Sequence, residues 1–283
     1  MSAPERIPAQ PGLTADELLL SRGRLTVHGR VVDASNAVLF ATAELDGRRA
    51  PCVYKPVAGE SPLWDFPEGT LARREVAAYT VSRALGWPLV PPTVLRDGPH
   101  GEGMCQLWVG PEPGSGEDSR PAGDLLALVD GDEPGPGWKA IGYAETAPGR
   151  TALLVHADDE RLRRMAVLDA VINNADRKGR HLLPLPDGRL YGIDHGVTFH
   201  TEDKLRTLLW GWAGEPLPPE AMAVLGELSD TLEDPGSPLS AELASLLGPD
   251  ECRALRERTA RLLTTGRHPA PGGRWPVIPW PPV

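Results

Sequence analysis

The stretch VLDAVINNADRKGRHLLPLPDGRLYGIDHGVTF, residues 167–199, decides how the fold and the function of this chain are interpreted. It begins as an apolar run with helical spacing, which ends at the amides of Asn173 and Asn174. Charged residues follow as far as His181, and an alternating apolar pattern around the turn PDG then predicts a β-hairpin. Charge and amide groups gathered between two buried elements indicate a functional loop.

The predicted hairpin brings residues from its two ends together. Because its strands run antiparallel, His181 and Asp194 become near neighbours at the open end, and Asp176 lies a few residues away. Two carboxylates repel each other unless they share a cation or a proton, so this group suits Mg²⁺ with nucleotide phosphates. Gly196 permits a backbone bend that would direct Asp194 toward the site. Each Asp taken alone is explained as well by a helix cap or a turn.

Lys55 is the second candidate, in the strand pattern PCVYKPV with apolar neighbours on both sides. A lysine midway along a half-buried strand costs desolvation energy unless an anion meets it. We expect that anion to be Glu75, on the helix that follows. A strand lysine held by a helix glutamate, with its ammonium directed at nucleotide phosphates, is the arrangement found in protein kinases. The alternative is an exposed lysine on an edge strand, its stem lying over apolar surface.

Composition narrows the class of protein. With 283 residues, 41% of them hydrophobic, the chain can bury the core of one two-lobed domain or of two small ones. The formal net charge of −10 argues against non-specific nucleic-acid binding, which requires clustered cations. The longest apolar runs are too short for a membrane-spanning helix, and the N-terminus lacks the pattern of a signal peptide. Three cysteines far apart in the chain fit reduced thiols, so we expect a cytoplasmic protein.

The order of elements predicts an α+β fold with two lobes. The first half alternates short apolar runs with turns and contains one helical pattern, whereas helical patterns dominate after residue 160. Strands are predicted at 24–32, 37–45, 50–57, 91–97 and 103–109, and helices at 69–86, 160–174, 203–214, 219–232 and 249–263. The divisions that follow are an N-terminal extension (1–22), an antiparallel-sheet N-lobe (23–110), a Pro/Gly-rich hinge or linker (111–137), a mainly helical C-lobe (138–266) and a Pro/Trp-rich tail (267–283) that could bind a partner.

The strings VYKP, REVAAY, NNADRKGRH and YGIDHG occur in the order and spacing of the phosphatidylinositol 3- and 4-kinase superfamily and its bacterial relatives. More closely, the chain resembles an actinobacterial family of phosphatidylinositol-kinase-like proteins, over residues 24–212. The resemblance implies an atypical kinase fold and ATP-dependent phosphoryl transfer with Mg²⁺ or Mn²⁺.

The resemblance also assigns roles to individual residues. Lys55 would hold the α- and β-phosphates of ATP, and Glu75 would orient it. Asp176 would be the base or positioner of the acceptor hydroxyl, and Asp194 would bind metal. Nucleotide contacts would come from Ser35 and Asn36, in a turn that replaces a glycine-rich loop, and from the strand-to-hinge segment Gln106, Leu107, Trp108 and Val109.

The chain departs from the family pattern at His181. Lipid kinases carry an Asn there that ligates a second metal ion, and imidazole suits softer transition metals better than Mg²⁺. His181 would therefore orient phosphate, bind one Mn²⁺-like ion or mark reduced activity, and Asn173 or Asn174 could replace it as an oxygen ligand. The strings G-x-G-x-x-G, H-R-D and D-F-G of ordinary protein kinases do not occur in the sequence.

We therefore predict an ATP-dependent phosphotransferase whose acceptor is a protein, a small molecule or a lipid. A pseudokinase that binds nucleotide without turnover remains the first alternative, supported by His181 and by the missing glycine-rich loop. A second alternative is a metal-dependent hydrolase built from several histidines and aspartates, among them His156 and Asp158. Its weakness is that the sequence has neither an H-E-x-x-H string nor the paired-His spacing of a zinc site. Nucleotidyl transfer would use the same residues as phosphoryl transfer.

Overall fold

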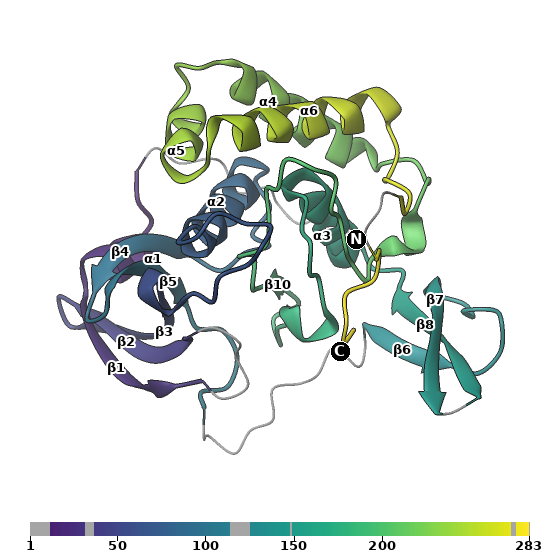
Figure 1. The fold of residues 1–283 in the computed structure, drawn as a ribbon, viewed down its shortest axis with the longest axis horizontal. Coiled ribbons are helices and arrows are strands. Elements are labelled where there is room, and N and C mark those ends of the chain that lie inside the picture. Colours follow the sequence, from purple (N-terminus) through teal and green to yellow (C-terminus); the bar gives the residue numbers. More distant parts are fainter. Residues whose placement is uncertain (1–11, 32–36, 114–124, 148, 273–275, 283) are drawn as a thin grey trace.

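The structure is a computed structural model, and it describes residues 12–31, 37–113, 125–147, 149–272 and 276–282 (Figure 1). It confirms the predicted α+β class, with an antiparallel sheet in the N-terminal lobe and a mainly helical C-terminal lobe. Within the described residues, no helix is both long enough and apolar enough to cross a membrane.

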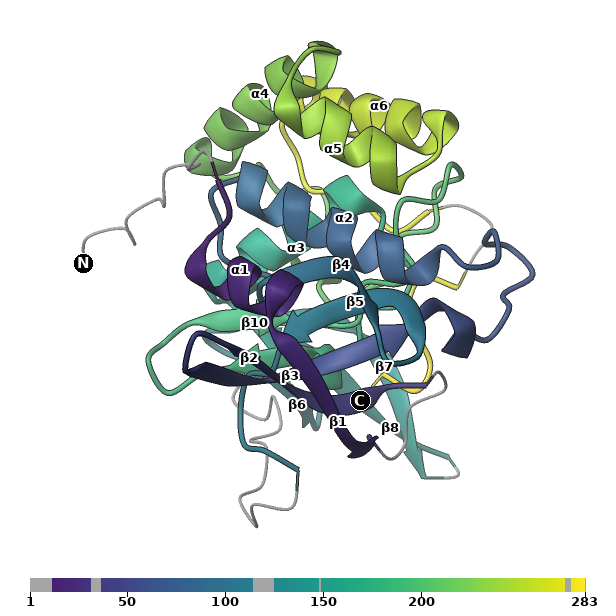
Figure 2. The ribbon, with the colours of Figure 1, turned by 90° about the vertical axis from the view of Figure 1, so that its left-hand side faces the viewer.

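The N-lobe is one five-stranded antiparallel sheet with a helix on each face (Figure 2). Its strands are β1 (Arg24–Arg30), β2 (Leu39–Leu45), β3 (Arg48–Pro56), β4 (Thr93–Gly98) and β5 (Gly101–Leu107), in the order β1-β2-β3-β5-β4. Helix α1 (Ala15–Arg22) lies within the range 1–22 that is predicted as an extension, and helix α2 (Leu71–Ala84) follows β3 after a short 3-10 turn, η1 (Val57–Gly59).

Alternation along β3 sends neighbouring side chains to opposite faces of this sheet. Tyr54 packs with Leu19 and Leu20 of α1 in one apolar cluster. Lys55 pairs across the sheet with Met104, which packs against Val76 of α2. The register therefore places Lys55 on the α2 side of the sheet.

A second, three-stranded sheet spans the end of the predicted linker (111–137) and the start of the predicted C-lobe (138–266). Its strands are β6 (Leu126–Val129), β7 (Trp138–Ala147) and β8 (Arg150–Ala157), in the order β6-β8-β7. Strand β6 lies within the range 111–137 that is predicted as hinge or linker, and the sequence does not predict it. The Pro/Gly-rich composition around β6 does not indicate a strand. Its partner β8 is separated from β6 by β7 in the sequence, so no hairpin signal marks the pair either.

The C-lobe packs four helices around one large apolar core. They are α3 (Glu160–Ile172), α4 (Pro219–Glu233), α5 (Pro238–Leu246) and α6 (Pro249–Thr265), and the predicted hairpin is formed by β9 (Leu182–Pro184) and β10 (Leu190–Gly192) after a 3-10 turn, η3 (Gly179–His181). The predicted helix over 203–214 is wrong, since that segment forms a 3-10 turn, η4 (Trp210–Trp212), and otherwise lacks regular helix. The backbone of Arg206 instead bonds Asn174 and Arg177 in the loop after α3, and this extended pairing excludes helical hydrogen bonds.

The polar loop after α3 is fixed by a fully buried ion pair. The guanidinium of Arg177 contacts the carboxylate of Asp169 through two nitrogens, at 2.9 and 3.0 Å. The side chain of Asn174 donates to the same carboxylate at 2.9 Å, and Arg177 also donates to the carbonyl of Ile193 beyond β10 at 3.1 Å. These bonds join α3, the loop and the hairpin into one unit.

Removing one partner of this pair is expected to destabilise the whole C-lobe. In Asp169→Ala, the buried guanidinium of Arg177 is left without its counter-charge, and the free energy of unfolding should fall by about 3–5 kcal/mol. Urea denaturation measures the change. Asp187→Ala is the matched control, because Asp187 and Arg189 form an exposed pair in the hairpin turn, for which little or no loss is expected. Equal losses in the two variants would refute the structural role given to Asp169.

Candidate active site

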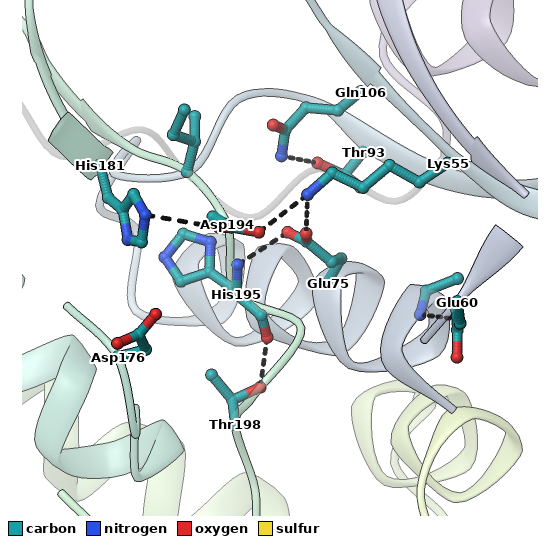
Figure 3. A network of polar contacts seen from close by, with 12 residues as sticks. Lys55, Glu60, Glu75, Thr93, Gln106, Asp176, His181, Asp194, His195 and Thr198 are labelled. Carbon is teal, nitrogen blue, oxygen red and sulfur yellow. Dashed lines mark hydrogen bonds and ion pairs between the residues drawn. The ribbon is translucent and has the colours of Figure 1, made fainter. Parts of the chain in front are cut away.

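The ammonium of Lys55 lies between two carboxylates from different parts of the chain (Figure 3). Its Nζ donates to Oε1 of Glu75 at 2.6 Å and to Oδ1 of Asp194 at 2.9 Å. Burial disfavours the charged form of Lys55, but the carboxylates of Asp194 and Glu75 outweigh it and hold the pKa of the ammonium above its ordinary value. Lys55 is therefore charged at neutral pH, and the structure brings together three of the predicted site residues.

Glu75 is a buried residue of α2 that uses both of its carboxylate oxygens. While Oε1 accepts from Lys55, Oε2 accepts from the backbone N–H of His195 at 2.9 Å. The N-terminus of α2 is itself held by Glu60, whose carboxylate accepts from the backbone N–H groups of Leu71 and Ala72. Glu75 thereby joins the N-lobe sheet to the segment that follows β10.

Asp194 follows β10 in a left-handed backbone conformation, with φ at 61°. The sequence places the bend at Gly196, but the structure places it at Asp194 itself, since Gly196 is not among the residues with positive φ. A Cβ on Gly196 would lie 3.4 Å from the Cβ of Leu71, which is ordinary van der Waals contact, so packing against the start of α2 does not require a glycine there. The side chain of Asp194 is 51% exposed, which leaves it accessible to a ligand.

His181 and Asp194 are neighbours at the open end of the β9–β10 hairpin, as the sequence predicts. Nε2 of His181 lies 3.4 Å from Oδ2 of Asp194, and the backbone N–H of Ile193 donates to the carbonyl of His181 at 3.0 Å. Burial lowers the pKa of His181 to about 4. The imidazole is therefore neutral at pH 7, and one of its nitrogens is available as a lone-pair donor.

Asp176 lies on the loop after α3, on the other side of His195 from Lys55 in Figure 3. Its backbone N–H donates to the side-chain oxygen of Asn174 at 3.0 Å, and its carboxylate pairs with the ammonium of Lys178 at 3.0 Å. Burial raises the pKa of Asp176 above its ordinary value, although Lys178 opposes the shift. The carboxylate has no ion pair with Lys55 among the described residues.

The two asparagines at the end of α3 hold the backbone in place. Asn173 caps the helix in a left-handed conformation, and its side chain bonds the backbone of His200, Glu202 and Lys204. The side chain of Asn174 is divided between Asp169 and the N–H of Asp176. Both amides are buried and already engaged, so neither fits the alternative role of an oxygen ligand in place of His181.

The predicted nucleotide segment lies at the end of β5. Gln106 pairs with Val53 across the sheet and is buried on the same face as Lys55, where its amide donates to the hydroxyl of Thr93 at 2.8 Å. The half-buried residues Leu107, Trp108 and Val109 follow it, and the ring of Trp108 packs edge-on against Phe40. Ser35 and Asn36, the other predicted contacts, lie outside the described residues.

Three contributors are not identified from the sequence. His195 is fully buried, its backbone anchors Glu75, and its Nε2 lies 2.6 Å from the guanidinium of Arg177. Its Nδ1 has no hydrogen-bond partner in the described part of the chain. Arg177 and Asp169 form the frame beneath it. The spacing of Asp169 and Arg177, one on the helix and one just beyond it, is the signal that could have found them.

The remaining residues of the described chain give no metallohydrolase site. No group of three or more His, Cys, Asp or Glu side chains in the described part of the chain, the candidate active site included, is arranged to hold a metal ion. The ring nitrogens of His156 bond the carbonyl of Ala157 and the N–H of Gly211, and Asp158 accepts from the indole of Trp212. Those histidine and aspartate groups serve packing of the second sheet.

The described part of the tail contacts the candidate site. The carbonyl of Pro282 accepts from the backbone N–H of Gly179, three residues after Asp176. The carbonyl of Val277 accepts from Thr207 and from the indole of Trp210. These residues of the tail therefore pack on the body of the C-lobe and on the polar loop.

The chain was compared with known proteins and structures. No protein-family profile matches it. Among solved structures, hydra Fam20 with sugar aligns with 87% of this chain and 86% of its own, with a TM-score of 0.50 and 13% identity, and the chain shares this kinase-like fold. The Helicobacter pylori proinflammatory kinase CtkA aligns with 88% of this chain and 94% of its own, with a TM-score of 0.44 and 8% identity.

One relative is similar in sequence over almost the entire length. Protein Rv2133c of Mycobacterium tuberculosis is 50% identical over 268 residues, which cover 94% of this chain and 95% of the relative. Identity of this extent means that the two chains share one fold and one arrangement of elements. The chain described here therefore belongs to the family of protein Rv2133c.

Proposed function

We propose that the protein is an ATP-dependent phosphotransferase whose acceptor is still to be identified. The observation that carries the proposal is the position of the Lys55 ammonium, bonded at once to Glu75 of α2 and to Asp194 after β10. A cation held between the two lobes by acidic groups is suited to meet the phosphates of a nucleotide. Proteins of this fold host different functions, so the residues of the site carry the argument rather than the fold.

Lys55 and Glu75 would act as a phosphate clamp. An ammonium has three N–H donors, so Lys55 can keep its bond to Glu75 while it turns a donor from Asp194 to a phosphate oxygen. Glu75 is buried and also held by the backbone of His195, so it fixes the position of the ammonium. Asp194, which is half-exposed, would be released for a metal ion.

Asp194 and His181 would supply two ligands to a divalent cation, a carboxylate oxygen and a neutral imidazole nitrogen. No group of three such side chains in the described chain could hold an ion alone, so the nucleotide phosphates and water would complete the coordination. This combination fits Mn²⁺ better than Mg²⁺, because Mg²⁺ prefers oxygen ligands throughout. When bound with ATP, the ion would supply positive charge that neutralises the phosphates.

Asp176 would accept a hydrogen bond from the hydroxyl of the acceptor. Its raised pKa makes it a stronger proton acceptor than an ordinary aspartate. Lys178, paired with the same carboxylate, would orient it. The bonds of Asn174 to Asp169 and to the backbone of Asp176 keep the loop from shifting as the acceptor binds.

A second candidate is a nucleotide-binding protein without turnover. The observation in its favour is that both acidic groups proposed for chemistry already have partners, Asp194 with Lys55 and His181, and Asp176 with Lys178. Transfer of the γ-phosphate from radiolabelled ATP to water, to the protein itself or to added acceptors separates the two candidates. Nucleotide binding with no transfer under Mg²⁺ or Mn²⁺ would favour the second.

Lys55→Met tests the phosphate clamp. Because a charge-assisted hydrogen bond to phosphate is lost, affinity for ATP with Mn²⁺ should fall about 10- to 100-fold, measured by calorimetry. Lys139→Met is the control, since Lys139 lies on β7 and pairs with Glu215 at 2.6 Å. The proposal fails if ATP binds both variants as tightly as it binds the wild type.

His181→Asn tests the choice of metal ion. An amide oxygen is a harder ligand than imidazole, so the ratio of ATP affinity in Mg²⁺ to that in Mn²⁺ should rise about tenfold. His200→Asn is the control, because His200 bonds the backbone of Asp65 and Glu202. An unchanged ratio in His181→Asn, with the wild-type melting temperature retained, would remove His181 from the metal site.

A further inference from the structure

A cavity of about 300 Å³ lies along α6, outside the candidate active site. Its walls come from α6, from the end of α3 and from the segments around residues 203–205 and 266–270. We call it the α6 cavity. Aliphatic side chains such as Leu205 and Leu262 form much of its wall, and three arginines join them: Arg258, Arg261 and Arg267.

Arg258 is the unusual member of this lining. It is 6% exposed and has no ion pair with any described residue. Its Nε and Nη1 donate to the carbonyls of Val171 and His200, at 3.1 and 3.0 Å, while its Nη2 has no partner in the described chain. Burial lowers the pKa of Arg258 to about 10, although nearby carboxylates, that of Asp203 first, oppose the shift. A buried guanidinium with a free donor is costly unless an anion meets it.

The other charged groups of the lining leave a positive balance. Arg267 donates to the carbonyl of Gly214, and Arg261 lies 4.0 Å from Asp203 with both side chains exposed. His268 is neutral at pH 7, because burial lowers its pKa to about 4. Three guanidinium groups thus share one carboxylate, in a chain whose formal net charge is −10. Such a local excess of cations is opposite in sign to the rest of the molecule.

From this cavity we infer a second ligand site, for a small organic anion that carries one phosphate or carboxylate on an apolar body. Arg258 would hold the anionic group, with Arg261 at the rim, and Leu205 and Leu262 would contact the apolar body. The volume is at the lower end of the range for small-molecule sites, which fits a compact ligand rather than a nucleotide.

The site would also be connected to the candidate active site through the backbone. The carbonyl of His200 accepts from both Arg258 and the amide of Asn173, which caps α3 immediately before the polar loop. An anion bound to Arg258 would therefore act on the carbonyl of His200, which also accepts from the cap residue Asn173. Binding itself does not depend on the proposed phosphotransferase activity.

The test uses the full chain without nucleotide, at constant ionic strength, with four probes. Phenyl phosphate and benzoate carry a charge on an apolar ring, inorganic phosphate carries the charge alone, and benzyl alcohol carries the ring alone. We expect at least one ring anion to raise the melting temperature, since a ligand that binds the folded state stabilises it. Inorganic phosphate and benzyl alcohol should bind about tenfold more weakly than that probe, each lacking one set of contacts.

Charge reversal locates the binding. Arg261→Glu should weaken the ring anion about tenfold, because a rim cation becomes an anion. Arg253→Glu is the matched control, as Arg253 is equally exposed on α6, pairs with Asp250 and does not line the cavity. The same affinity should persist in Lys55→Met.

Several outcomes would overturn the inference. One is that neither ring anion raises the melting temperature, and another is that benzyl alcohol or inorganic phosphate binds as tightly as the ring anion. A third is that Arg253→Glu and Arg261→Glu weaken binding of the ring anion equally. The last is loss of binding in Lys55→Met, which would place the anion at the nucleotide site. Wild-type melting temperatures of the variants without probe show that each one folds. Arg258 itself is left intact, because its bonds to Val171 and His200 also support the core.

Discussion

The structure around the site depends on one electrostatic requirement, that the ammonium of Lys55 be compensated where it is largely removed from water. The ion-pair partners of this ammonium are not carboxylates of β3 or of the strands beside it. Glu75 comes from α2 and Asp194 from the segment after β10, so compensation draws the sheet, the helix and the C-lobe hairpin together. Because ionic interactions weaken steeply with distance and with access of water, these two ion pairs contribute to the relative position of the elements at the place where a phosphate would bind.

The residues that fix the geometry of the candidate active site are not the ones that could contact a ligand there. Asp169 and Arg177 are completely buried and satisfy each other, and Glu75 is buried between Lys55 and the backbone of His195. Asp194 is half-exposed, and its contacts can be exchanged for a ligand at little cost. A rigid buried frame that presents accessible acidic groups is the arrangement that pre-organises a site for charge stabilisation.

Local chemistry explains which parts could be predicted from the sequence. The pairing of Lys55 with Glu75 follows from a charge on an apolar strand and the next acidic helix residue, and that of His181 with Asp194 follows from the turn between them. Strand β6 is not visible in the sequence, because its pairing with β8 is non-local and leaves no periodic signal in a Pro/Gly-rich region. The helical pattern over 203–214 misleads for a related reason: tertiary hydrogen bonds to the loop after α3 outweigh its propensity. The contacts between these side chains could thus be predicted, and so could the fold class, whereas a strand and an extended segment that depend on distant partners could not.

The candidate active site has an excess of negative charge, whereas the α6 cavity has an excess of positive charge. At the candidate active site, the carboxylates of Glu75, Asp176 and Asp194 are paired directly with two ammonium groups, those of Lys55 and Lys178, so the ion-paired cluster is one positive charge short. Under the proposed function, such a cluster would favour the entry of a divalent cation, which would then compensate the negative charge of a nucleotide. The α6 cavity has three guanidinium groups and one carboxylate in its walls, so it favours an anion without any metal. A ligand that binds the cavity as a free anion would therefore bind the active site only together with a cation, and the two sites can select different ligands although both recognise acidic groups.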